Sequence, residues 1–322
     1  MLTNGLEKKT MSGVDARDAF FEELYRLAEE DRNVIFMTAD MGAFSLERFK
    51  RDLPRQYFNV GVAEQNMVSV AAGLAMAGKK VFIYSIVPFV TLRCLEQIKI
   101  DLCGMNLPVT VVGIGAGVMY GGDGPTHHAL HDIAVMRALP GMTIYNPSDA
   151  LLTQASVRLA YEHPGPVYIR IEKGCLPVLY EEAGGGFQQG FAQLRAGTDL
   201  SIMATGLMVH QAIAAKDILS RVGISVGIFD IYRLKPFNEQ ALLEVMIHSP
   251  RVVSLEENSR IGGLGTALIE LCADAGCRVP FMRMAWPDRH CHEACSREDI
   301  HRHYQMDARS IAEKILAWVR SS

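Results

Sequence analysis

The chain has 322 residues, 49% of them apolar and 21% charged, so at about 150 residues per domain it predicts two globular domains rather than a disordered chain. Its 32 basic and 36 acidic residues give a net charge of −4, which argues against nucleic acid as a partner because phosphates are bound by clustered positive charge. No apolar run reaches the ~18 residues of a membrane helix, and an odd count of 7 cysteines is not typical of a disulfide framework, so we expect a cytoplasmic protein without membrane contact.

The first half of the chain alternates short, β-branched apolar segments with helical patterns. We predict strands at 34–38, 81–84, 109–114, 142–145 and 167–171, and helices at 17–30, 63–77, 91–102 and 149–162. This alternation is typical of a parallel sheet covered by crossover helices. We therefore expect an α/β domain over residues 15–178, preceded by an N-terminal tail of residues 1–14.

A glycine-rich stretch without apolar periodicity, residues 179–197, predicts a linker. The alternation then restarts, with strands expected at 200–204, 225–230, 252–255 and 279–282 and helices at 209–219, 239–247 and 264–275. A last helix at 307–320 places Ile311, Ile315 and Val319 on one face. The second half thus predicts a smaller α/β domain over residues 198–322.

Two glycine-rich motifs suggest phosphate sites but depart from the sites they resemble. Gly113-Ile-Gly-Ala-Gly117 follows a predicted strand but lacks the third glycine of a dinucleotide-binding loop, so we interpret it as a tight turn. Gly122-Asp-Gly124 with Asn146 has the spacing with which thiamine diphosphate enzymes hold Mg²⁺ and the diphosphate. A proline directly follows both Gly124 and Asn146, which does not fit that context, and we predict no metal or diphosphate site at Asp123.

The same residues fit better in a longer pattern. Gly121-Gly-Asp-Gly-Pro-Thr-His-His128 and Phe58-Asn-Val-Gly-Val-Ala-Glu-Gln-Asn66 together resemble the pyrimidine-binding half of transketolase. The resemblance extends over about residues 15–320 and implies the pyrimidine-binding domain of thiamine diphosphate enzymes followed by a transketolase C-terminal domain. Further motifs that agree with it are Ala16–Asp18, His131–Gly141, Asn146–Asp149, Gly165–Arg170, Leu234–Phe237 and Glu256–Gly265.

A full-length transketolase also has an upstream diphosphate-binding domain, and nothing in this sequence corresponds to it. The resemblance therefore implies the C-terminal subunit of a split transketolase, without a metal site of its own. It implies an N-terminal partner subunit that holds the diphosphate and Mg²⁺, an α2β2 heterotetramer, and small-molecule sugar substrates.

The resemblance also implies which residues contact the cofactor. In isolation, Glu64 would be a helix N-terminal carboxylate stabilised by the helix dipole by under about 1 kcal/mol. In the family motif it is the glutamate that hydrogen-bonds the aminopyrimidine nitrogen of thiamine diphosphate and promotes removal of the thiazolium proton. Phe89 lies where transketolases place an aromatic ring against the pyrimidine, and Ile86 is an aliphatic neighbour where the family has an aromatic residue.

Four further residues match substrate positions of the family. Asp123 and His127 correspond to an aspartate that accepts from a sugar hydroxyl and a histidine that assists proton transfer; a solvated turn is the alternative. Arg17 and Arg170 match two positions that bind the terminal phosphate of the sugar, and guanidinium groups suit phosphate because they offer paired, permanently charged donors. Outside the family context each arginine would be an ordinary surface residue.

One departure bears on the reaction. Typical transketolases place a Thr-His pair eight residues before the aspartate, where this chain has Ile114-Gly115. Two-carbon ketol transfer from an anionic ketose to an aldehyde is the leading hypothesis. The alternatives are a 2-oxoacid-decarboxylating relative, similar to 1-deoxyxylulose-5-phosphate synthase or the β-subunit of a 2-oxoacid dehydrogenase, and a non-catalytic orphan half that acts as a binding protein.

A cluster of potential metal ligands lies near the C-terminus, at His290, Cys291, His292, Cys295, His301 and His303. Their spacing matches no familiar zinc pattern. We predict a solvated loop rather than a metal site.

Overall fold

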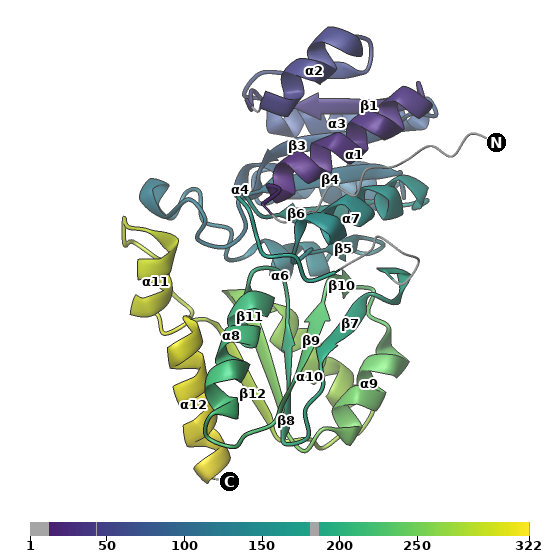
Figure 1. Ribbon diagram of the computed structural model, residues 1–322. Coiled ribbons are helices and arrows are strands. Elements are labelled where there is room, and N and C mark those ends of the chain that lie inside the picture. The colour runs from purple at the N-terminus through teal and green to yellow at the C-terminus, as the bar shows by residue number, and fades with distance from the viewer. Residues whose placement is uncertain (1–12, 43, 181–186, 322) are drawn as a thin grey trace, which may run out of the picture.

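The protein is described by a computed structural model for residues 13–42, 44–180 and 187–321. The chain forms two α/β domains, and the first half lies above the second in Figure 1. Each is built on a largely parallel sheet with helices around it, which confirms the predicted fold class. Among the described helices, none has both the length and the apolar composition needed to cross a bilayer.

The first sheet has seven strands in the order β10-β5-β6-β4-β3-β1-β2. Its parallel strands are β1 (Val34–Thr38), β2 (Tyr57–Asn59), β3 (Lys80–Ile86), β4 (Val109–Ile114), β5 (Thr143–Tyr145) and β6 (Val167–Ile171). β1, β4 and β6 are buried along their whole length because helices cover both faces, which explains their continuous apolar runs. β10 (Arg233–Lys235) comes from the second half of the chain and pairs antiparallel with β5.

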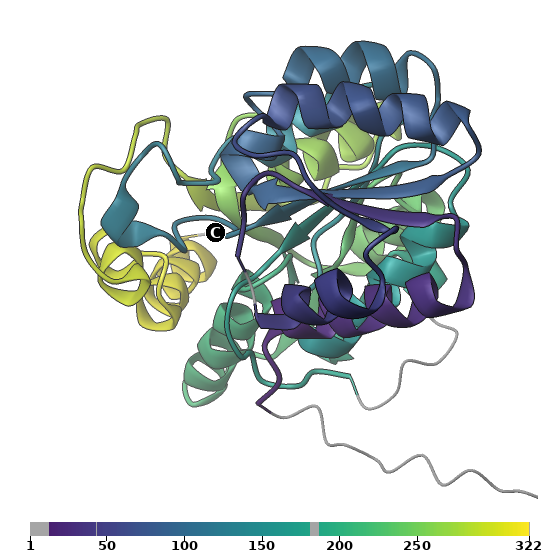
Figure 2. The same cartoon turned by 90° about the horizontal axis from the view of Figure 1, so that it is seen from above.

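Helices cover the two faces of this sheet, as Figure 2 shows from above. One face packs against α1 (Ala16–Glu30) and α7 (Ala150–Glu162), the other against α3 (Glu64–Met76). α7 begins as predicted, because the side chain of Asp149 accepts from Leu152 N. The shorter helices of this half are α2 (Phe44–Asp52), α4 (Val87–Val90), α5 (Leu95–Gln97), the π-helix η1 (Ile98–Cys103), the 3₁₀ turn η2 (Gly121–Asp123) and α6 (Asp132–Arg137).

The continuous helix predicted at 91–102 is instead broken. α4 ends at Val90, the hydroxyl of the next residue, Thr91, donates to Val87 O at 2.6 Å, and the chain turns before α5 and η1. Arg93 N donates to Pro88 O, so the turn holds Arg93 beside the end of β3. The break therefore places Phe89 and Arg93 at the carboxyl edge of the sheet.

The second sheet has the order β12-β11-β8-β9-β7. Its strands are β7 (Phe191–Arg195), β8 (Leu200–Ala204), β9 (Val226–Ile231), β11 (Val252–Ser259) and β12 (Phe281–Trp286), all parallel except β7. Its helices are α8 (Met208–Ser220), α9 (Glu239–His248), α10 (Leu264–Asp274), α11 (Arg297–His303) and α12 (Ala308–Ser321). α12 packs against α8 through Ile311 and Ile315, on the face that the sequence indicated.

The stretch predicted as a linker, 179–197, is partly regular structure. It contains the 3₁₀ turn η3 (Phe187–Gln189) and β7, which forms the antiparallel edge of the second sheet. β7 is only partly buried, so its sequence lacks the apolar run by which the other strands were recognised. Residues 181–186 and most of the predicted tail 1–14 lie outside the described residues.

A buried cluster of charges joins the two halves. Arg297 of α11 donates to Glu172, which follows β6, at 2.7 Å, and its Nε donates to Glu257 Oε1 of β11 at 3.0 Å. His301 Nε2 lies 2.6 Å from the same oxygen of Glu257. Burial alone would raise the pKa of Glu257, but the charges of Arg297 and His301 hold it well below its usual value. We call Glu172, Glu257, Arg297 and His301 the interdomain charge cluster.

Candidate active site

The residues singled out in the sequence gather at the carboxyl ends of the parallel strands of the first sheet. Glu64 follows β2, Phe89 follows β3, and the loop that carries Asp123 and His127 follows β4. In open parallel sheets this edge is where ligands bind. The arrangement brings segments that are far apart in sequence to a common edge.

Glu64 is the first residue of α3, and only 3% of its surface is exposed. The preceding residue, Ala63, provides no side-chain cap, so a carboxylate at this position benefits from the partial positive charge of the helix end. Its Oε2 lies 2.8 Å from Arg93 Nη1. Nothing in the sequence indicated this pairing, because Arg93 lies in a different element of the chain, beyond β3.

Phe89 is half-buried and lies between Arg93 and His127. The Arg93 guanidinium carbon is 4.3 Å from the centroid of the Phe89 ring, and the ring of His127 meets Phe89 edge-on at 5.0 Å. His127 Nδ1 is 2.9 Å from the hydroxyl of Thr126. Ile86 ends β3 and is also half-buried. The planar guanidinium of Arg93 thus contacts both the Glu64 carboxylate and the Phe89 ring, and the imidazole of His127 packs against Phe89 in a T-shaped arrangement.

Tyr120 connects these residues to the substrate candidates. Its ring is 6.0 Å from that of His127, and the ammonium of Lys173, which follows β6, is 5.4 Å from the Tyr120 centroid. Burial raises the pKa of Tyr120, while the positive charge of Arg17 opposes this rise and the negative charge of Asp123 adds to it. His127 and Lys173 therefore flank Tyr120, and the charges of Arg17 and Asp123 lie near enough to affect its pKa. The sequence prediction did not include Tyr120 or Lys173.

The Arg17 guanidinium has an unsatisfied hydrogen-bond donor among the described residues. It lies in the first turn of α1, and its Nε is buried without a hydrogen-bond acceptor among the described residues. Its Nη2 makes a long contact of 3.5 Å with Asp18. A buried donor without an acceptor is costly, so this guanidinium fits a place where an anion binds.

Arg170 has a different environment. It is 2% exposed within β6, its Nε donates to Asp132 at 2.8 Å, and its Nη2 donates to the carbonyl oxygens of Ala129 and Glu257. Asp132 also accepts from Tyr168. These contacts engage Nε and Nη2 of Arg170 inside the protein and give it a structural role in joining α6, β6 and β11. A phosphate contact stays a prediction for its remaining nitrogen, Nη1.

We expect Arg170→Met to lower the free energy of unfolding by about 3–5 kcal/mol, because it leaves the carboxylate of Asp132 buried without its cation. Chemical denaturation of the purified chain measures this. Arg17→Met is the matched control, since the Arg17 side chain is 20% exposed and its contact with the described residues is the long one to Asp18. An Arg170 variant as stable as wild type, with a raised KM for an anionic substrate, would favour the predicted phosphate-binding role over the structural one.

Gly115 occupies the position where the sequence pattern of typical transketolases has a histidine. Its φ is +88°, and a Cβ there would lie 2.1 Å from the Cε2 atom of Tyr120. The Tyr120 ring thus fills the space that a side chain at position 115 would need. The absence of a side chain at Gly115 leaves room for the Tyr120 ring. The missing histidine of the family pattern is thus coupled to the presence of a tyrosine in the same loop.

The potential metal ligands near the C-terminus do not converge. Cys291 is buried and its pKa is raised to about 11 by burial, His301 belongs to the interdomain charge cluster, and His303 pairs with Glu293 at 3.3 Å. Within the described part of the chain, no group of three or more histidine, cysteine, aspartate or glutamate side chains could hold a metal ion.

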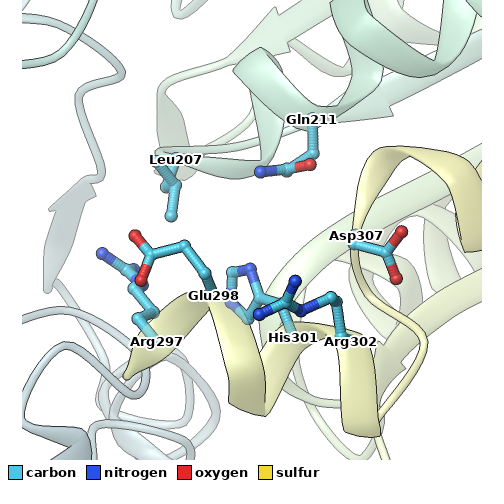
Figure 3. Close-up of a pocket in the computed structure, with 7 residues that line it drawn as sticks. All are labelled: Leu207, Gln211, Arg297, Glu298, His301, Arg302 and Asp307. Carbon is cyan, nitrogen blue, oxygen red and sulfur yellow. The ribbon is translucent and has the colours of Figure 1, made fainter.

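A pocket of about 280 Å³ lies between the start of α8 and α11 (Figure 3). Its charged side chains have both signs, and none of the site residues predicted from the sequence lines it. In Figure 3, Gln211 extends from α8 toward the side chains of α11. The residues that line it are Leu207, Gln211, Arg297, Glu298, His301, Arg302 and Asp307.

The chain matches two domain families over nearly all of its length. Residues 12–178 match the transketolase pyrimidine-binding domain, and residues 190–311 match the transketolase C-terminal domain. An apulose-4-phosphate transketolase subunit from Phocaeicola vulgatus is 37% identical over 95% of this chain and 98% of its own length. A 6-deoxy-6-sulfo-D-fructose transketolase subunit from a Clostridium species is also 37% identical, over 84% of each chain.

Two structures and a third relative extend the comparison. A split-gene transketolase, described as an inactive β4 tetramer, superposes with a TM-score of 0.84 at 32% identity and covers 96% of this chain and 98% of its own. Transketolase from Pichia stipitis, 21% identical, shares the fold with a TM-score of 0.82, and the match covers 46% of that longer chain. 1-deoxy-D-xylulose-5-phosphate synthase from Syntrophotalea carbinolica is 33% identical over 92% of this chain and 47% of its own.

Proposed function

Since the chain belongs to the transketolase family, we propose that it is the pyrimidine-side subunit of a two-subunit transketolase that moves a two-carbon ketol unit from an anionic ketose to an aldehyde. The observation that supports this most is that the buried carboxylate of Glu64 and the half-buried ring of Phe89 both contact one planar group that carries nitrogen atoms, the guanidinium of Arg93. A cofactor pyrimidine presents the same kind of group to these two side chains.

The residues fit thiamine diphosphate, which when bound supplies a nucleophilic carbon that adds to a carbonyl and holds the electrons of the broken carbon–carbon bond. Glu64 would share a proton between its carboxylate and the pyrimidine ring nitrogen, and its burial keeps water from competing for that proton. Phe89 would stack on the ring and fix its plane. His127, in contact with Phe89, would exchange a proton with the substrate oxygen through its imidazole.

An anionic substrate is supported by the group around Tyr120. Arg17 has a buried donor without an acceptor among the described residues, and Lys173 extends from the end of β6 beside the same ring. These two cations would bind a phosphate or sulfonate, and Asp123 would accept from sugar hydroxyls. The names of two relatives, which specify a sugar phosphate and a sulfo-sugar, are in keeping with such a substrate.

The shape of the loop adds a prediction about position 115. Gly115→His should destabilise the chain by about 1–3 kcal/mol, because the new side chain overlaps the Tyr120 ring. Adding Tyr120→Val should recover the steric part of this loss but not the backbone strain of a side chain at φ +88°, and a double-mutant cycle of unfolding free energies measures the recovery. Purely additive effects of the two substitutions would show that Tyr120 does not fill the space beside Gly115.

A partner subunit is part of this proposal, in keeping with two relatives at 37% identity that are themselves named as subunits. We infer that it binds over the exposed apolar face of α3 and η1, which adjoins Glu64. Val70 of α3 is 41% exposed and Ile100 of η1 is 56% exposed, and Ser69 of α3 donates to Asp101 of η1 at 2.7 Å. Exposed apolar side chains on helices that are held together in this way are typical of protein interfaces. We expect two copies of each subunit, with Mg²⁺ held by the partner.

A second candidate function is decarboxylation of a 2-oxoacid, because the chain is also 33% identical to half of a 1-deoxy-D-xylulose-5-phosphate synthase and has no imidazole at Gly115. The complex with the partner subunit, loaded with thiamine diphosphate and Mg²⁺, distinguishes the two. Ketol transfer predicts aldose formation from a ketose phosphate without gas release. Carbon dioxide from pyruvate would favour the second reaction, and neither product from any ketose or 2-oxoacid would favour a non-catalytic binding protein.

A further inference from the structure

Arg93 makes both contacts that the proposed function assigns to the cofactor pyrimidine. Its Nη1 lies 2.8 Å from the Glu64 carboxylate, and its guanidinium covers the Phe89 ring at 4.3 Å. A guanidinium is planar, carries N–H donors along its edge and stacks on aromatic rings. The edge of an aminopyrimidine has the same planarity and also bears nitrogen atoms. The two groups therefore compete for one place.

The backbone at Arg93 is fixed while its side chain has an exit. Arg93 N donates to Pro88 O at 3.1 Å, and Arg93 O accepts from Gln65 in the first turn of α3 at 3.1 Å. The next residue, Cys94, contacts the carbonyl of Phe89 through its sulfur. In contrast, 41% of the Arg93 side chain is exposed, against 4% for Glu64. Rotation about the side-chain bonds of Arg93 is enough to clear the site, without a change in the fold.

We propose that Arg93 is a placeholder: in the cofactor-free chain its guanidinium neutralises Glu64 and covers Phe89, and it must leave both before the pyrimidine binds. This inference rests on the proposed role of Glu64. Its consequence is that displacing Arg93 uses part of the binding energy of the cofactor. The contact also stabilises the free chain, since among the described residues Arg93 is the cation that pairs with the buried carboxylate of Glu64.

The first test measures cofactor binding in the complex of this chain with its partner subunit. Arg93→Met should bind thiamine diphosphate about tenfold more tightly than wild type and load it faster, because nothing has to be displaced. Arg278→Met, on an exposed arginine of the second domain, is the matched control and should leave the dissociation constant unchanged. Titration by protein fluorescence, without substrate, gives both values. Equal or weaker binding by Arg93→Met overturns the proposal.

The second test uses the full chain alone and needs no cofactor. Arg93→Met should lower the midpoint of thermal unfolding, and Glu64→Gln in the same chain should restore much of the loss, since it removes the buried charge. Additive effects in this cycle would show that the Arg93–Glu64 contact is absent in solution. Should Glu64 variants leave activity intact, the proposed function fails; should they abolish it while Arg93→Met binds the cofactor no more tightly, the placeholder alone fails.

Discussion

Glu64→Ala is expected to lower the turnover of the complex with its partner subunit by about 10²–10⁴-fold, the range attributable to a positioned acid–base group. The carboxylate lies at the start of α3 and is only 3% exposed, so it can share a proton with the pyrimidine with little competition from bulk water. Its truncation should leave the fold intact, because the helix dipole contribution is under about 1 kcal/mol and Arg93, the cation left unpaired, is 41% exposed to water. Steady-state kinetics and circular dichroism of the same preparations measure the two effects.

Glu239→Ala provides the control for this prediction. Glu239 is the first residue of α9, as Glu64 is of α3, but it is exposed and belongs to the second domain. Its loss should change the turnover by less than the experimental error. Substantial residual activity in Glu64→Ala would remove the catalytic assignment. An equal loss in Glu239→Ala would show that a helix-end effect, and not cofactor contact, explains the result.

Arg297→Met is expected to cause the largest loss of stability, at least about 3–5 kcal/mol, because it leaves the carboxylates of Glu172 and Glu257 buried without their shared cation. These carboxylates belong to different halves of the chain, so the variant should also let the halves unfold in separate transitions. Scanning calorimetry of the full chain measures both changes. Arg302→Met, on the same helix but exposed, should cost no more than about 1 kcal/mol.

The effect of Arg297→Met depends on pH with a defined sign. Despite its burial, Glu257 has a pKa below its usual value of 4.5, so its contribution to stability is present above that pH and is lost as the pH falls. The difference in stability between wild type and Arg297→Met should therefore narrow as the solution is acidified below that value. A difference that stays constant throughout the acid range would contradict the ionic character of the interdomain charge cluster.

The parallel strands could be located from the sequence because burial on both faces leaves an uninterrupted apolar run. The bounds predicted for 34–38, 109–114, 167–171 and 200–204 coincide with β1, β4, β6 and β8. β7 and β10 could not be found in this way. Each is an edge strand whose partner is distant in sequence, β10 pairing with β5 across the boundary between the domains. Their short, mixed sequences have no period that a strand pattern detects.

The residues of the candidate site likewise differ in whether the sequence could predict them. Phe89, Asp123 and His127 follow strands that the sequence predicted, so their gathering at one edge was foreseeable. Glu64 follows β2, a short edge strand that the sequence did not predict, and was identified by its motif. Arg93 and Tyr120 could not be foreseen, because their importance lies in contacts with side chains from other segments. For Arg170 a signal existed: it stands between two isoleucines on a strand buried throughout, where an arginine needs an internal carboxylate.

The most direct test of the split-enzyme proposal is mild affinity purification of the tagged chain from its own host, with the identity and amount of each companion and the bound thiamine diphosphate recorded. We expect one stoichiometric companion whose sequence carries a Gly-Asp-Gly motif with a downstream asparagine, and thiamine diphosphate retained in the complex when Mg²⁺ is present. Recovery of the chain only as a homo-oligomer, without such a companion under any condition, would leave no holder for the diphosphate and would contradict the proposal.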